Sequence, residues 1–239
     1  MANVFGFSTE PSSGGDFIPI IKYDARSGRL FRVDRVQDVN GFTSEQVDIT
    51  ASFKAIADFD NAETGYIAFT ANSAPSFVMV PIGNMRPAKP SETHKDGVRF
   101  LMKLNKTCGG DKQIREIAGV AKTFLAGVEQ VYEEYLRERG KYPGQLPVIV
   151  LARTTPVTTG SGATKSTNYR PDFKIEGWAK RPDDLIHIAA TNPVAGNGAA
   201  TNGSGAAPST GGQTVPPPNN FRPGNTVPQG NTNLDDDFG

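Results

Sequence analysis

Short segments rich in β-branched and aromatic residues recur over residues 17–106, and turn residues separate them. In several of them apolar and polar positions alternate, which is the pattern of a half-buried strand. The segments are 17–24, 29–36, 46–59, 65–71, 76–83 and 98–106. Because they are short and closely spaced, they predict an antiparallel meander or a small barrel.

The period of the apolar positions changes after Asp111. From Ile114 to Leu136 apolar residues recur every three or four positions, which predicts one amphipathic helix of about seven turns. Asp111 is a suitable N-cap for this helix, and Gly140 is a suitable terminator.

Strand-like segments return after the helix. The stretch "VIVLA" (148–152) is apolar on both faces and predicts a central strand, whereas 153–168 reads as a polar loop and 169–182 as a last strand. The predicted fold class is therefore mainly β: an OB-fold-like barrel of about five strands with one long amphipathic α-helix. A β-sandwich with one helix remains an alternative.

The last part of the chain has a different composition. Residues 191–239 are rich in Gly, Pro, Asn, Ser and Thr, and their only aromatic residues are Phe221 and Phe238. Such a segment buries too little apolar surface to offset the entropy lost on ordering. We therefore expect two parts: an OB-fold domain over 1–190 and a disordered linker with an acidic tip over 191–239.

The formal net charge of zero hides an uneven distribution. The tail has one cation, Arg222, against the three aspartates of "NLDDDFG", so it carries a net charge of −2 and leaves +2 on residues 1–190. A weakly basic body with an acidic tip describes the chain better than its overall neutrality does.

The residues that enzymes and metal sites need are scarce. One cysteine, Cys108, allows no intramolecular disulfide, and the two histidines, His94 and His187, give no zinc-ligand spacing. "GSGATKS" fails as a phosphate-binding loop because Thr164 stands where glycine must precede Lys165. No signal peptide or membrane-spanning run is evident. We expect a cytoplasmic protein without catalytic residues, cofactor, metal or membrane partner.

Residues 169–181 point to a nucleic acid. A regular strand would place Trp178 among cations, on a face with Arg170, Lys174 and Lys180. An exposed ring stacks on any base, and nearby cations neutralise phosphates. A bulge at Pro171 or Gly177 would instead return Trp178 to the core.

Other strands also interleave aromatic rings with Lys and Arg, the mixture that a single-strand groove requires. We expect only about two to four rings to face the ligand, because a domain of this size needs most of its aromatics in the core. The candidate residues for binding single-stranded DNA are Trp178, Lys174, Lys180, Arg170, Arg181, Tyr169, Lys103, Arg99, Phe77, Arg86, Phe31, Arg32 and Lys54.

A small β body, a Gly/Pro/Asn-rich linker and a terminal "DDDF" together resemble the replicative single-stranded DNA-binding proteins of tailed phages. The resemblance implies that the tip recruits DNA polymerase, primase-helicase and repair enzymes, and that it competes with DNA for the basic groove. The matching tip residues are Asp235, Asp236, Asp237 and Phe238. Tails of that family usually end on the phenylalanine, whereas Gly239 follows it here.

The resemblance and the residues together predict a non-enzymatic protein of a phage replication and recombination system, acting in the cytoplasm of the infected bacterial host. It would bind single-stranded DNA without strong sequence preference. Two alternatives remain: a protein–protein adaptor whose tail is a docking peptide, and a recombination annealing protein.

Overall fold

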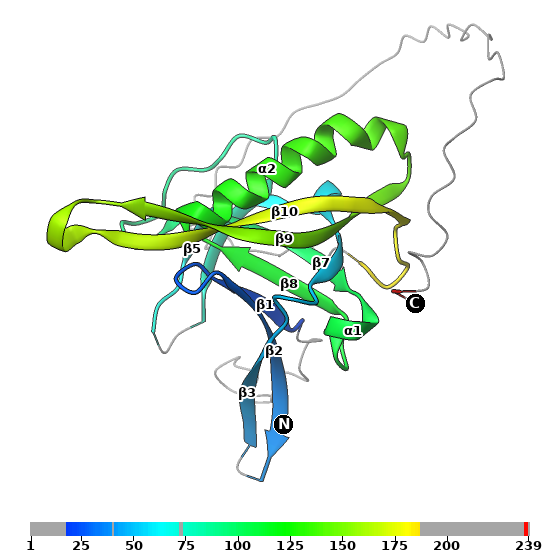
Figure 1. Ribbon diagram of the computed structural model, residues 1–239, viewed down its shortest axis with the longest axis horizontal. Helices are drawn as coiled ribbons and strands as arrows, with labels where there is room; N and C mark the ends of the chain where they lie inside the picture. The colour runs from blue at the N-terminus through cyan, green and yellow to red at the C-terminus, as the bar shows by residue number, and fades with distance from the viewer. Residues whose placement is uncertain (1–17, 40, 72–73, 187–236, 239) are drawn as a thin grey trace, which may run out of the picture. The chain divides into compact units, whose positions relative to one another are not determined.

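The computed structural model describes residues 18–39, 41–71, 74–186 and 237–238 (Figure 1). All of these residues belong to one compact unit. The predicted disordered linker falls outside the described residues, and so do Asp235 and Asp236 of the tip.

Ten strands and two α-helices make up the described part of the chain. The strands are β1 Ile20–Asp24, β2 Arg29–Asp38, β3 Gly41–Asp48, β4 Lys54–Ala57, β5 Glu63–Ala68, β6 Ser76–Pro81, β7 Lys95–Leu104, β8 Ile114–Gly119, β9 Gln145–Thr159 and β10 Ser166–Lys180. The helices are α1 Lys106–Gly109 and α2 Lys122–Glu138, with 3₁₀ turns at Phe59–Asn61, Arg139–Lys141 and Gly162–Thr164.

All ten strands share one sheet, whose main path runs β10-β9-β4-β7-β8-β1-β2-β3. β5 pairs with β7 and with β6 beside this path, and only the β1–β8 pair is parallel. A mainly β fold with one long helix is therefore confirmed. The predicted closed five-stranded barrel is wrong, because β10 and β3 end an open path and do not pair with each other within the described residues.

The predicted helix begins later than the apolar period suggests. Ile114 and Ile117 lie in β8, which pairs antiparallel with β7 and parallel with β1. Asp111 is therefore not the N-cap; Ala121 takes that position, and α2 ends at Glu138. Pairing on both sides of β8 outweighs the local helical period, because it buries this segment between two strands.

The predicted loop over 153–168 is instead the outer part of a long β-hairpin. β9 and β10 pair out to Thr159 and Ser166, and Figure 1 shows the hairpin projecting beyond α2. Gly160, at a φ of 79°, lies in the turn that reverses the chain. Most of the outer side chains are exposed, so the hairpin lacks the apolar alternation by which a strand is predicted, although it is rich in Thr.

The central strands bury side chains on both faces of the sheet. We call the side against which α2 packs the helix face; its core includes Ala55, Phe100, Met102, Ile149, Phe173 and, from α2, Phe124, Val128, Val131 and Tyr135. We call the opposite side the open face; its buried cluster includes Ile56, Leu101, Leu146, Val148 and Ala179. α2 lies close to β10, since a Cβ on Gly127 would stand 2.3 Å from the carbonyl oxygen of Pro171.

Trp178 belongs to the helix face, so its prediction as an exposed stacking platform is wrong. The pairing of β10 with β9 shifts between Ile175 and Gly177, where Glu176 is an extra residue. One extra residue exchanges the faces of all side chains that follow it. Trp178 is consequently only 7 % exposed. Its ring stacks on Tyr142, with centroids 4.6 Å apart, and on Tyr135, with centroids 5.9 Å apart.

We predict that Trp178→Ala lowers the free energy of unfolding by roughly 3–5 kcal/mol, because it leaves a cavity beneath α2. Urea denaturation followed by circular dichroism measures this loss. Phe69→Ala is the control, since Phe69 is 54 % exposed, and it should change stability by less than about 1 kcal/mol. A Trp178→Ala protein as stable as the control would contradict the buried position of the ring.

Candidate nucleic-acid interface

Strand pairing brings six of the predicted DNA-binding residues to the open face. Residues directly opposite each other on paired strands share a face. Ile56 lies opposite Lys103 and Val148, and Val150 lies opposite both Lys54 and Lys174. Lys22 lies opposite Phe31. Arg99 shares this face with Lys103 by alternation along β7, and Phe77 joins it through Ile67 of β5. The six are Lys54, Lys103, Lys174, Arg99, Phe31 and Phe77.

Two aromatic rings and a guanidinium lie together at the β5–β6 end of the open face. The Arg99 guanidinium carbon lies 5.0 Å from the centre of the Phe77 ring, and the Phe69 ring meets Phe77 nearly edge-on, with centroids 6.4 Å apart. Phe69 is 54 % exposed and thus accessible for stacking. Sequence reasoning missed it, although alternation from Ile67 would have placed it on this face.

Carboxylates moderate the positive charge at this end. Arg99 donates to Glu63, its cross-strand partner, and lies 3.9 Å from Glu116. Burial raises the pKa of the Glu116 carboxyl; Arg99 opposes this rise, and Glu63 adds to it.

The last described residues of the chain, Asp237 and Phe238, are docked on the open face. Phe238 is 3 % exposed and packs in the cluster of Ile56, Leu101, Leu146, Val148, Ala179 and Leu185. The Asp237 carboxylate accepts a hydrogen bond from Lys54 Nζ at 2.9 Å, and the main-chain carbonyl oxygen of Asp237 accepts one from the Lys106 amide at 3.0 Å. We call this place the tip site: an apolar pocket bordered by a cation.

Lys54 holds two carboxylates at once. Its Nζ lies 2.9 Å from Asp237 and 3.2 Å from Glu176, the extra residue of the β10 bulge. Burial alone would lower the pKa of Lys54, but hydrogen bonds to the two carboxylates outweigh it and raise that pKa above its ordinary value. Lys54 therefore stays charged between the two carboxylates.

The segment Arg181–Leu185, which we call the strap, covers the open face beside the tip. Arg181 makes a bidentate pair with the fully buried Asp58, at 2.7 and 2.9 Å, and Lys103 Nζ lies 3.0 Å from Asp184. Leu185 is 2 % exposed and packs in the same cluster as Phe238. Arg181 thus anchors the strap to the body. Lys103 lies beneath the strap and holds it through the ion pair with Asp184.

Of the remaining predicted residues, Lys180 borders the tip site beside the strap, whereas Arg32, Arg86, Arg170 and Tyr169 do not gather at the open face. Arg32 pairs with Asp34 and donates to the Cys108 carbonyl, Arg86 pairs with Asp96 over the Tyr66 ring, and Arg170 pairs with Asp172. Tyr169 is half-buried, and its carbonyl oxygen accepts from Tyr23 Oη at 2.9 Å. Lys180 is exposed and lines a cavity of about 400 Å³ with Phe238 and the strap.

Within the described ranges no three His, Cys, Asp or Glu side chains are grouped so that they could hold a metal ion. No helix in that same part of the chain is long and apolar enough to span a membrane. Comparison with family models, with curated proteins and with solved structures finds no match to this chain. Its function must therefore be inferred from the open face itself.

We predict that Phe238→Ala releases the tip. Losing this ring removes roughly 1.5–3 kcal/mol of apolar burial, which lowers the docked fraction relative to the free fraction by about tenfold or more. The methyl resonances of Ile56, Leu101 and Val148 should shift in a ¹³C methyl spectrum. Phe221→Ala is the matched control, because it removes the other tail aromatic, and it should leave these resonances unchanged. Equal spectra for both variants would contradict the docked tip.

Proposed function

We propose that this protein binds single-stranded DNA on its open face, without strong sequence preference, as part of a phage replication and recombination system in the infected bacterial cell. The docked tip is the observation that carries the proposal. An acidic residue on Lys54 and a ring in the neighbouring pocket occupy the places that a phosphate and a base would take. A chain segment with this chemistry marks a surface suited to a flexible polyanion carrying planar groups.

Base stacking and the neutralisation of phosphate charge would both contribute to binding. Phe69 and Phe77 at one end of the open face, and Phe31 at the other, offer ring surfaces to bases, and every base has such a face. Lys22, Lys54, Lys174 and Arg99 lie on the same face of the sheet and would neutralise phosphates. Neither contact reads base edges, so the preference for sequence would be weak.

The tip would act as an internal competitor. DNA and the tip both need Lys54 and the open face, so binding of a strand releases Asp237 and Phe238. The released tip would then be available to DNA polymerase, primase-helicase and repair enzymes. Because the apolar pocket receives the Phe238 ring rather than the chain terminus, a residue after the ring is compatible with docking.

An oligonucleotide-binding fold in the strict sense is not needed for this function. Single-strand binding requires a continuous face with rings and cations, which an open sheet can offer as well as a barrel. We propose kinship with that fold on the grounds of the mainly β architecture with one long helix. A protein adaptor would also use the tail, but it would not need exposed rings beside cations on the body.

Deleting residues 230–239 should tighten binding to single-stranded DNA. If the tip covers the open face between about half and nine-tenths of the time, the apparent affinity rises about two- to tenfold when it is removed. The gain should shrink as salt rises, because salt also weakens the Lys54–Asp237 pair. Fluorescence anisotropy with a labelled oligonucleotide at two salt concentrations measures both effects. Unchanged or weaker affinity after truncation would exclude the tip as a competitor.

Phe69→Ala and Phe77→Ala should each weaken binding of single-stranded DNA by roughly 1–3 kcal/mol, the usual value of one base stacked on an aromatic ring. Leu136→Ala is the control, because Leu136 is a large apolar residue, 48 % exposed, on α2. The same anisotropy titration compares the three variants. Affinities equal to that of the control would show that bases do not stack at this end of the open face.

A further inference from the structure

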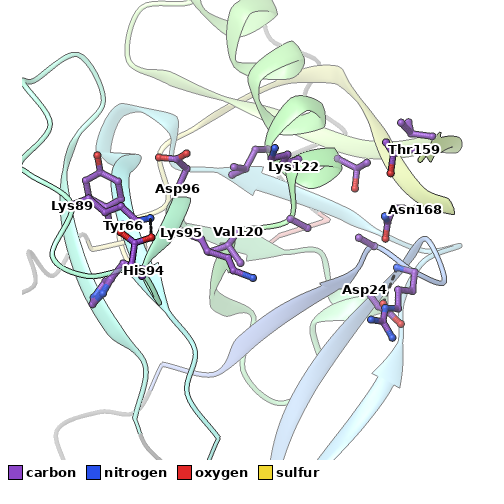
Figure 2. Close-up of a pocket in the computed structure, with 17 residues that line it drawn as sticks. Asp24, Tyr66, Lys89, His94, Lys95, Asp96, Val120, Lys122, Thr159 and Asn168 are labelled. Carbon is purple, nitrogen blue, oxygen red and sulfur yellow. Dashed lines mark hydrogen bonds and ion pairs between the residues drawn. The ribbon is translucent and has the colours of Figure 1, made fainter. Parts of the chain in front are cut away.

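A cleft of about 980 Å³ lies apart from the tip site and is lined by five segments of the chain (Figure 2). They are the β1–β2 turn, Tyr66 of β5, the stretch from Lys89 to Asp96, the junction of β8 with α2, and the outer part of the β9–β10 hairpin. In Figure 2, Tyr66, Lys89 and His94 mark one end, Asp24, Asn168 and Thr159 mark the other, and Lys122 lies between them. The cleft is thus elongated rather than a closed pocket.

The cleft carries cations that its own carboxylates do not neutralise. Asp96 is paired with Arg86 at 2.6 Å, and Glu92 lies 3.7 Å from Lys89. The third carboxylate, Asp24, accepts from Ser27 and from the Arg26 amide. Among the described residues, no ion pair involves the side chains of Arg26, Lys95 or Lys122. These three come from three different segments, and after Asp24 offsets one of them they leave the cleft with a net positive charge.

The cleft is continuous with the open face along two strands. Lys95 lies opposite Ile67 and alternates with Arg99 along β7, so it belongs to the open-face side although it also lines the cleft. Four residues of strand separate Lys95 from Arg99, which corresponds to about 13 Å. On β1, Lys22 faces the open face, and the turn that follows this strand enters the cleft.

The lining of the cleft contains apolar surface as well as cations. Val120, Ala121, Leu125 and Val157 contribute apolar surface, and the Tyr66 ring lies at one end beneath the Arg86 guanidinium, 4.6 Å from its centroid. A nucleic-acid strand combines phosphates with apolar faces of bases and sugars, and it matches such a lining. An acidic peptide would match the cations but has no need of continuity with the open face.

We propose that the cleft is a second contact site for the same DNA strand, in which phosphates leaving the open face bind Lys95, Lys122 and Arg26. This inference rests on the proposed function and extends it. Short oligonucleotides occupy the open face alone, whereas longer ones also reach the cleft. The protein thereby covers more nucleotides than the open face alone can hold.

The test compares Lys95→Gln/Lys122→Gln with a matched control, Lys112→Gln/Arg137→Gln, which also removes two exposed cations. Full-length protein is titrated with thymidine oligomers of about 8 and about 30 nucleotides at several salt concentrations. For the longer oligomer, the slope of log K against log salt should be shallower by about 1.4 in the cleft variant than in the control. For the shorter oligomer, the two variants should give equal slopes.

Three results would overturn the inference. If the cleft variant and the control have equal slopes with the longer oligomer, the strand does not enter the cleft. If the slope of log K against log salt is shallower than in the control by the same amount for both oligomers, Lys95 and Lys122 act on the open face and not at a second site. If DNA binding is kept but binding of a peptide of residues 230–239 is lost, the cleft is a site for an acidic peptide. Failure of the unmutated protein to bind either oligomer would instead remove the proposed function, and this inference with it.

Discussion

The structure depends on covering a sheet that is apolar on both sides. In β4, β7 and β9, neighbouring residues are buried on opposite faces, as in the pairs Ala55 and Ile56, Leu101 and Met102, and Val148 and Ile149. Such strands need a layer on each face. The described part of the chain provides one long helix, and α2 covers only the helix face. The strap and the tip supply the second layer.

The strap and the tip carry carboxylates, so this second layer also forms ion pairs with cations of the open face. The cations at the edge of the open face are held by carboxylates of the cover: Lys54 by Asp237, and Lys103 by Asp184. A phosphate that replaces one of these carboxylates exchanges one ion pair for another, so neither cation is left buried and unpaired. Arg181 differs, because its partner Asp58 is fully buried and belongs to the body. The strap is therefore anchored at its start by a buried pair, whereas the ion pair of the tip is partly exposed.

The prediction was correct for elements whose apolar periodicity lies within one short segment of the sequence. β1 and β2 lie in two of the segments predicted from their residue pattern, 17–24 and 29–36, and α2 occupies the later part of the predicted helix. Prediction failed where pairing between distant strands decided the outcome. Ile114 and Ile117 have the spacing of one helix face, whereas in β8 they lie on opposite faces of the sheet, and only pairing with β7 and β1 settles the choice.

The candidate site shows the same division. The residue types of the site were predictable, since Lys54, Lys103, Arg99, Phe31 and Phe77 stand out in the sequence as cations and rings among strand residues. That they share one face could not be predicted, because it depends on the register of seven strands. The error at Trp178 came from one bulged residue, Glu176, whose position no local pattern fixes.

The energetics of docking indicate how strongly the tip can compete. Burying the Phe238 ring contributes about 1.5–3 kcal/mol, and the hydrogen bond to the Lys106 amide about 0.5–1.5 kcal/mol. The Lys54–Asp237 pair contributes less than about 1 kcal/mol, because the Asp237 side chain is 47 % exposed. Closing a connection of the flexible kind that its composition predicts opposes docking by about 3–4 kcal/mol. The sum of these contributions lies near zero, so the docked and the free tip would be similarly populated, and a strand that makes several contacts at once would displace the tip.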